Sequence, residues 1–118
     1  MLTGCAGQQA ARGVQCNVHI GGSVLTIAAE KRFAYREAID AACRGEEAAL
    51  VNLLVFTEQT DGEAMLDHAN VLRALRDHLG ADRFDNVSQS LGIGRQKNID
   101  ALIRTAEKLH EATLGLRR

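Results

Sequence analysis

Three cysteines and four histidines are the side chains of this 118-residue chain most able to bind metals or to act as nucleophiles. No two histidines lie four residues apart, so no single helix presents the paired imidazoles of a zinc motif such as HExxH. Glu107 and His110 have the i, i+3 spacing of di-iron bundles, but the sequence lacks the second pair that those sites need. We therefore expect no metal site and no cofactor. The histidines are His19, His68, His78 and His110.

The other nucleophiles form no catalytic pattern. Ser23, Ser88 and Ser90 stand in no nucleophile-elbow sequence. Cys43 falls late in a predicted helix, where the negative end of the helix dipole disfavours a thiolate. The carboxylates are spaced as charged helix faces. We expect that the protein is not an enzyme.

The N-terminal stretch Leu2-Thr3-Gly4-Cys5 places a leucine, a small residue and a glycine before a cysteine. This order resembles the lipobox of bacterial lipoproteins. The resemblance implies lipid attachment at Cys5, where the thiol receives a diacylglyceryl group and the signal peptide is cut just before it. Residues 6–13 are small and polar, like a lipoprotein tether. Ala6, in place of the aspartate that retains lipoproteins at the inner membrane, implies anchoring in the outer membrane, facing the periplasm.

The segment before Cys5 is shorter than a signal peptide. Met1 and three further residues precede the cysteine, whereas the apolar region of a signal peptide alone needs about 7–15 residues. We therefore expect Met1 to be internal to a longer precursor. The alternative is a cytosolic protein with a chance match of four residues.

Cys16 and Cys43 are the two cysteines that remain if Cys5 is lipidated. In an oxidising periplasm they can pair and tie the N-terminal segment to the first helix. Closing a loop of this size stabilises a folded protein by roughly 3 kcal/mol on the chain-entropy estimate. The alternative is a pair of buried free thiols.

The composition favours one helical domain with no global attraction to polyanions. Apolar residues make up 46% and charged residues 25%, there is no proline, and the net charge is −1. That charge gives no electrostatic case for nucleic acid or an anionic membrane. The longest apolar run, 48–56, falls short of the roughly 18 residues of a membrane span. We assign 1–13 to the lipobox remnant and tether, and 14–118 to a single domain.

The start of that domain has the pattern of a β-hairpin. Apolar and polar residues alternate over 14–20, the period of a half-buried strand. Gly21 and Gly22 suit a two-residue turn, and residues 23–27 supply a second β-leaning run. We therefore expect a small hairpin over 14–27.

The rest of the domain has helical periodicity. The segment 46–58 is apolar nearly all round and belongs in the middle of a bundle. Thr60-Asp61-Gly62-Glu63 is a capping box that would begin the next helix. The predicted fold is mainly α, a compact bundle of about five helices behind the hairpin. The predicted helices span 28–44, 46–58, 61–79, 82–91 and 95–114.

Residues 87–103, VSQSLGIGRQKNIDALI, resemble the helix-turn-helix of bacterial transcription regulators. The resemblance implies a turn at Gly92 and a second helix that enters the major groove. Two features depart from it, since Asn98 stands where an apolar residue is usual and Gly94 replaces a capping serine. The implied alternative is a cytosolic DNA-binding regulator, with Arg95, Gln96 and Lys97 approaching DNA. A third alternative is a cytosolic interaction domain without nucleic acid.

We expect instead an envelope lipoprotein, anchored by lipid, that binds another envelope protein. Its size, helix content and anchor resemble those of the pilotins, which escort secretin subunits by gripping a short amphipathic helix in a groove. The resemblance implies an assembly-assisting role. The groove would draw on Leu53, Leu72 and Leu75, unless these leucines belong to the core; the sequence leaves both alternatives open.

Overall fold

The computed structural model describes Cys16 and residues 18–116, except for the side chains of residues 115 and 116. The predicted lipobox and tether, and with them Cys5, lie outside the described residues. The mainly α fold is confirmed. The described elements are α2 (Gly22–Glu30), α3 (Tyr35–Cys43), α4 (Glu47–Phe56), the 3₁₀ helix η1 (Thr57–Gln59), α5 (Gly62–Leu79), α6 (Ala81–Gln89) and α7 (Ile93–Leu116).

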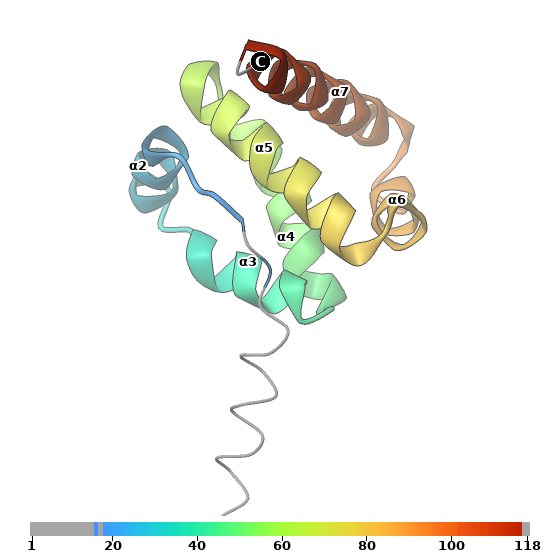
Figure 1. The fold of residues 1–118 in the computed structure, drawn as a ribbon. Helices are drawn as coiled ribbons and strands as arrows, with labels where there is room; N and C mark the ends of the chain where they lie inside the picture. The colour runs from blue at the N-terminus through green and yellow to red at the C-terminus, as the bar shows by residue number, and fades with distance from the viewer. Residues whose placement is uncertain (1–15, 17, 117–118) are drawn as a thin grey trace, which may run out of the picture.

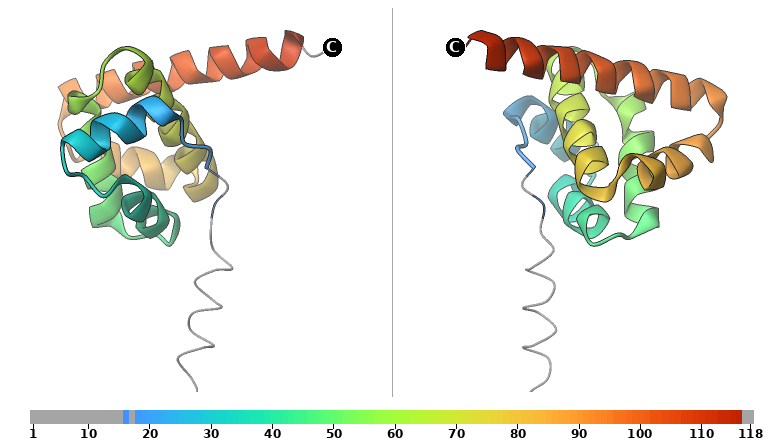
Figure 2. Two further views of the ribbon diagram at one scale, coloured as in Figure 1. Left: turned by 90° about the vertical axis from the view of Figure 1, so that its left-hand side faces the viewer. Right: turned by 45° about the vertical axis from the view of Figure 1, so that its right-hand side comes forward.

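Helix α5 runs through the middle of the bundle (Figure 1). It contacts α2 and α3 on one side and α6 and α7 on the other. Helix α4 packs against α3 and α6. The C-terminal turns of α7 project beyond the other helices (Figure 2). Because α5 touches four other helices, its side chains determine most of the internal contacts.

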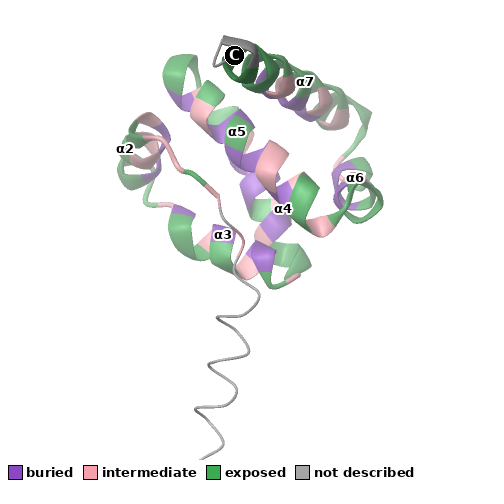
Figure 3. Cartoon of the chain, in the orientation of Figure 1, coloured by how far each residue is buried: buried purple, intermediate pink, exposed green. Residues whose placement is uncertain are grey.

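Buried residues, purple in Figure 3, occur on every labelled helix, and most of them are aliphatic. Each large apolar side chain removed from water in this way contributes about 1.5–3 kcal/mol to folding. Leu53 on α4 and Leu72 and Leu75 on α5 are fully buried. These three leucines therefore belong to the core cluster and do not line a groove. Other fully buried members are Val24, Leu54, Val71, Phe84 and Ile99.

The predicted hairpin over 14–27 is wrong, because residues from Gly22 onward form α2 and the described residues before it form no strand. Gly21 is the N-cap residue of α2, with an extended backbone. The Asp67 carboxylate of α5 accepts a hydrogen bond of 3.2 Å from the backbone N–H of Val24. A neighbouring hydroxyl, from Ser23, donates to Glu63 at 3.1 Å. Carboxylates of α5 thus accept a backbone N–H at the N-terminus of α2 and place negative charge beside the positive end of its helix dipole.

The predicted helix over 28–44 is two helices, because the chain turns at Arg32. This residue has a φ of 57°. The N–H groups of Arg32 and Phe33 donate to the carbonyls of Ala29 and Ala28 at 3.2 and 2.9 Å. These bonds are the pair that defines a Schellman C-cap. An arginine occupies the left-handed position that glycine usually takes, so the sequence carried no stop signal there.

The capping box predicted at Thr60 and Glu63 does not form. Asp61 is the N-cap residue of α5, and no side chain caps that end of the helix. The Thr60 hydroxyl donates instead to the Thr57 carbonyl at 2.7 Å, and Glu63 accepts from Ser23. The Thr60 side chain therefore stabilises the end of η1 locally, and the Glu63 side chain joins α5 to α2.

We predict that Gly21→Ala destabilises the protein by about 1–3 kcal/mol, the usual cost of overpacking. A Cβ at this position would overlap the Asp67 carboxylate that caps α2. The matched control is Gly22→Ala, where an added Cβ meets nothing within 4 Å. Its free energy of unfolding should stay the same or rise by up to about 1 kcal/mol. Urea unfolding of both variants checks the prediction, and equal losses from the two would contradict it.

Candidate functional site

A pocket of about 380 Å³ opens between the end of α4 with η1, the start of α5 and the first half of α7. Its floor is apolar and its edge is polar. This volume lies within the range of sites that bury small ligands or a few side chains of a partner. The apolar lining residues are Leu54, Met65, Ile99, Ala101 and Leu102, and the polar ones are Thr57, Glu58, Thr60, Arg95 and Asn98.

An ion pair between Arg95 of α7 and Glu58 of η1 stands at the edge of this pocket. The hydrogen bond to Glu58 raises the pKa of the Arg95 guanidinium. Both side chains remain about half exposed. The pocket therefore offers an approaching molecule a positive and a negative group side by side.

The three residues predicted to approach DNA have different surroundings. Arg95 is engaged with Glu58, Gln96 is half-buried and Lys97 is exposed. Ile99 is buried, whereas Asn98 is exposed and lines the pocket. The apolar position of α7 is thus one residue later than in the helix-turn-helix pattern, as the sequence indicated.

A fully buried imidazole lies directly behind the pocket wall. The Tyr35 hydroxyl lies 2.7 Å from Nδ1 of His68, and Nε2 lies 3.1 Å from the Leu53 carbonyl. Because a carbonyl can only accept, Nε2 carries the proton and Nδ1 accepts from Tyr35. Nε2 also lies 3.0 Å from Oγ1 of Thr57, which lines the pocket.

This environment keeps His68 neutral. Burial lowers the pKa of His68 to about 4, while its hydrogen bond to Leu53 acts in the opposite direction. Burial, with a smaller effect of the nearby Asp67 carboxylate, raises the pKa of Tyr35. Since His68 has no exposed surface, it cannot meet a solute. Its role is to fix η1, and so one wall of the pocket, against α3 and α5.

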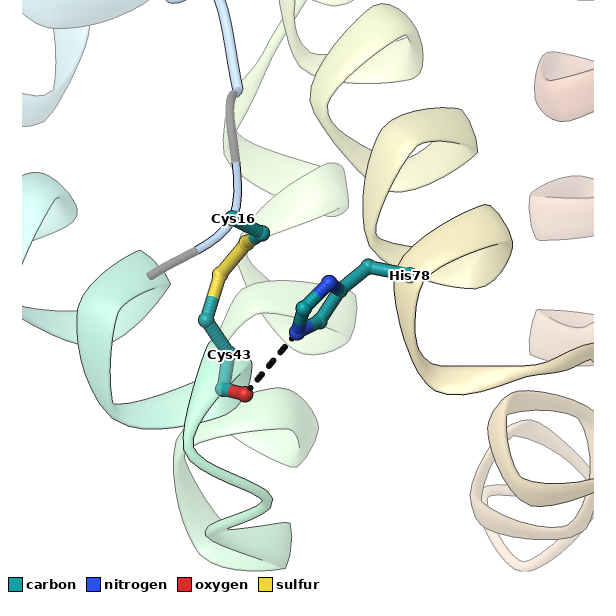
Figure 4. A group of neighbouring side chains, drawn as sticks. All are labelled: Cys16, Cys43 and His78. Atoms are coloured by element: carbon teal, nitrogen blue, oxygen red, sulfur yellow. Dashed lines mark hydrogen bonds between the residues drawn. A yellow bond between two sulfur atoms is a disulfide. The ribbon is translucent and has the colours of Figure 1, made fainter. Parts of the chain in front are cut away.

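Cys16, ahead of α2, and Cys43, the last residue of α3, are joined by a disulfide with their Cα atoms 5.8 Å apart. Nε2 of His78, in the last turn of α5, donates to the Cys43 carbonyl at 3.2 Å (Figure 4). Sequence reasoning missed this histidine, because it lies 35 residues from Cys43. No local spacing rule connects residues so far apart.

The other candidates from the sequence are separated. Glu107 and Arg76 line one charged depression, whereas His110 and His19 line another. The hydroxyl of Ser90 donates to the Val87 carbonyl at 2.6 Å. The i, i+3 pair of Glu107 and His110 therefore does not form one site.

Comparison with known protein families, curated proteins and solved structures finds no match to this chain. Among the described helices, none has both the length and the hydropathy needed to cross a bilayer.

We predict that the protein loses stability as the pH falls from about 6.5 to about 4. In this window the unfolded chain binds a proton at His68, whereas the folded protein does not. The free energy of unfolding should fall by up to about 1.4 kcal/mol per pH unit from this group, or about 3 kcal/mol in total.

The free energy of unfolding is measured in urea between pH 4.5 and 8 for the wild type and for His68→Gln. Because the carboxylates titrate in both proteins, the difference between the two pH dependences isolates the contribution of His68. The variant should show the shallower slope. NMR of the wild-type imidazole provides an independent check, since its shifts should stay those of the Nε2–H tautomer through pH 5.5. The prediction would be contradicted if the free energy of unfolding of both proteins had the same pH dependence and the His68 imidazole titrated near its ordinary pKa of about 6.5.

Proposed function

We propose that this chain is a non-catalytic lipoprotein of the bacterial envelope whose helical domain binds a partner protein in the pocket between η1, α5 and α7. The observation that carries the proposal is the lining of this pocket. Leu54, Ile99 and Leu102 supply an apolar floor, and Glu58 and Arg95 supply charges at the edge.

The fitting occupant is one face of a short amphipathic helix. Such a helix docks by placing apolar side chains, spaced three or four residues apart, into a hydrophobic depression. Its flanking polar residues would meet Glu58 and Arg95, which carry opposite charges. The pair would thereby favour one orientation of the bound helix, as complementary rim charges do in other interfaces. This mode of binding is the assembly-assisting role implied by the resemblance to pilotins.

The anchor is assigned to Cys5. The Leu2-Thr3-Gly4-Cys5 sequence supports this assignment, and the disulfide between Cys16 and Cys43 agrees with an oxidising compartment. Because Cys16 and Cys43 bond to each other, Cys5 is the cysteine of the sequence that is left for lipid attachment. Two or more acyl chains give stable attachment, so the helical domain need not bind lipid itself. The proposed location is the periplasmic face of the outer membrane.

We predict that the gene, expressed with its upstream DNA in a Gram-negative bacterium, yields a protein that begins at a triacylated Cys5. Membrane fractionation followed by mass spectrometry of the N-terminal peptide measures this directly. Cys5→Ala should abolish both the acylation and the recovery in the outer membrane. A soluble product that retains Met1 and an unmodified Cys5 would contradict the anchor. Salt-dependent DNA binding by that product would instead support the regulator alternative.

We predict that a photo-cross-linking amino acid at Ala101 captures one envelope protein, and that Leu102→Glu removes the adduct by placing a carboxylate in the apolar pocket. The matched control position is Ala29, which is also exposed but lies on α2, away from this pocket. Circular dichroism confirms that each variant is folded. Equal adducts from Ala101 and Ala29, or an adduct that survives Leu102→Glu, would contradict the assigned surface.

A further inference from the structure

The two cysteines and His78 form a compact group of metal-binding atoms. The sulfur atoms of Cys16 and Cys43 and a ring nitrogen of His78 all lie within 4.8 Å of one another. They come from three separate elements, namely the segment before α2, the end of α3 and the last turn of α5. In Figure 4 the imidazole ring lies next to the disulfide.

We propose that, when the disulfide is reduced, Cys16, Cys43 and His78 bind one Zn²⁺ ion. Thiolate sulfur and imidazole nitrogen are the ligands that zinc prefers in proteins. Two thiolates neutralise the charge of the ion, so the complex adds no net charge to a site where Cys43 is buried. A water molecule would complete the tetrahedron. This inference is independent of the lipid anchor and of the pocket.

The hydrogen bond of His78 favours this role. Metal-binding histidines usually donate their second ring N–H to a carbonyl or carboxylate, which fixes the tautomer and the ring orientation. Nε2 of His78 already donates to the Cys43 carbonyl, so Nδ1 would hold the lone pair for the metal. The carbonyl belongs to a residue that is itself a ligand, and the ring and the thiolate are therefore held together.

The distances require small movements of side chains only. In a tetrahedral zinc site the ligand atoms are about 3.5–3.8 Å apart, as follows from Zn–S and Zn–N bonds of about 2.3 and 2.0 Å. No two of the present ligand atoms are more than 4.8 Å apart, which is about 1 Å above that value. Once the sulfur atoms are no longer bonded, rotation about the Cα–Cβ bond of half-buried Cys16 can open the space for the ion.

The chemistry of the exchange balances with a thiol or phosphine reductant. The disulfide accepts two electrons and two protons and becomes two thiols. A dithiol reductant supplies both and becomes a disulfide, whereas a phosphine supplies the electrons, and one water molecule supplies the two protons and the oxygen of the phosphine oxide. Zn²⁺ then replaces the two thiol protons, which pass to water. An oxidising compartment would hold the same three residues as a disulfide with a neighbouring imidazole, and a reducing one would hold them as a zinc site.

The test uses the full chain with Cys5→Ser, so that only Cys16 and Cys43 supply thiols. Protein reduced with a phosphine is titrated with Co²⁺ and then with Zn²⁺. We expect a thiolate-to-cobalt charge-transfer band that saturates at one ion per chain and is bleached by Zn²⁺. Zinc binding near neutral pH should release about two protons per ion. The oxidised protein should show neither effect.

Three variants separate this site from adventitious binding. Cys16→Ser and Cys43→Ser should each abolish the charge-transfer saturation. His78→Gln should lower the affinity for Zn²⁺ by more than the roughly 10–100-fold that is lost when a hydrogen-bond partner of a metal ligand is removed. The matched control is His110→Gln, an exposed histidine of α7, which should bind Zn²⁺ like the parent. Equal affinities of the two histidine variants would overturn the three-residue site.

Circular dichroism before and after reduction measures whether the reduced chain unfolds. In that case one equivalent of Zn²⁺ should restore the helical signal of the parent and of His110→Gln, but not that of Cys16→Ser. A reduced chain, folded or unfolded, that gains neither cobalt absorption nor structure from the metal would overturn the proposal.

Discussion

The hydrogen bonds of one neutral imidazole determine how four elements of this protein fit together. His68 belongs to α5, accepts from Tyr35 of α3, and lies within hydrogen-bonding distance of the Leu53 carbonyl of α4 and the Thr57 hydroxyl of η1. Removing the imidazole would leave several buried polar groups without partners, each at a cost of about 1–3 kcal/mol. The Phe56 ring packs against the His68 imidazole and stacks on the Phe33 ring. The position of η1, and with it one wall of the pocket, follows from this contact.

The sequence predicted those parts of the fold that depend on local periodicity. The helices near 46–58, 61–79, 82–91 and 95–114 were found because apolar residues recur with the helical period, and Gly45, Gly80 and Gly92 adopt positive φ values between them. The start of the domain was wrong for a tertiary reason. Residues 23–27 fit a strand and a helix equally well over so short a length, and Asp67, whose carboxylate accepts from the Val24 N–H at the start of the helix, lies more than forty residues away.

The candidate site was less predictable than the helices, because its parts are contributed by distant segments. The pocket needs Glu58 beside Arg95, which are 37 residues apart. The sequence suggested a role for Arg95 only in the DNA-binding alternative, since nothing local indicates an acidic partner on η1. Leu53, Leu72 and Leu75 show the converse problem. Their apolar character marks them as internal or as part of a groove, and only the packing of α4 against its neighbours distinguishes the two.

Helix α7 has two mechanically different parts. Its first half supplies Ile99 and Ile103 to the core, whereas residues 108–114 are all exposed and project past the bundle. Isolated helical turns are only marginally stable in water. The last turns of α7 adjoin the bundle along the depression that Leu109, His110 and Thr113 share with residues of α5. They can therefore fray and re-form, or be trimmed by a protease, while the bundle below them stays folded.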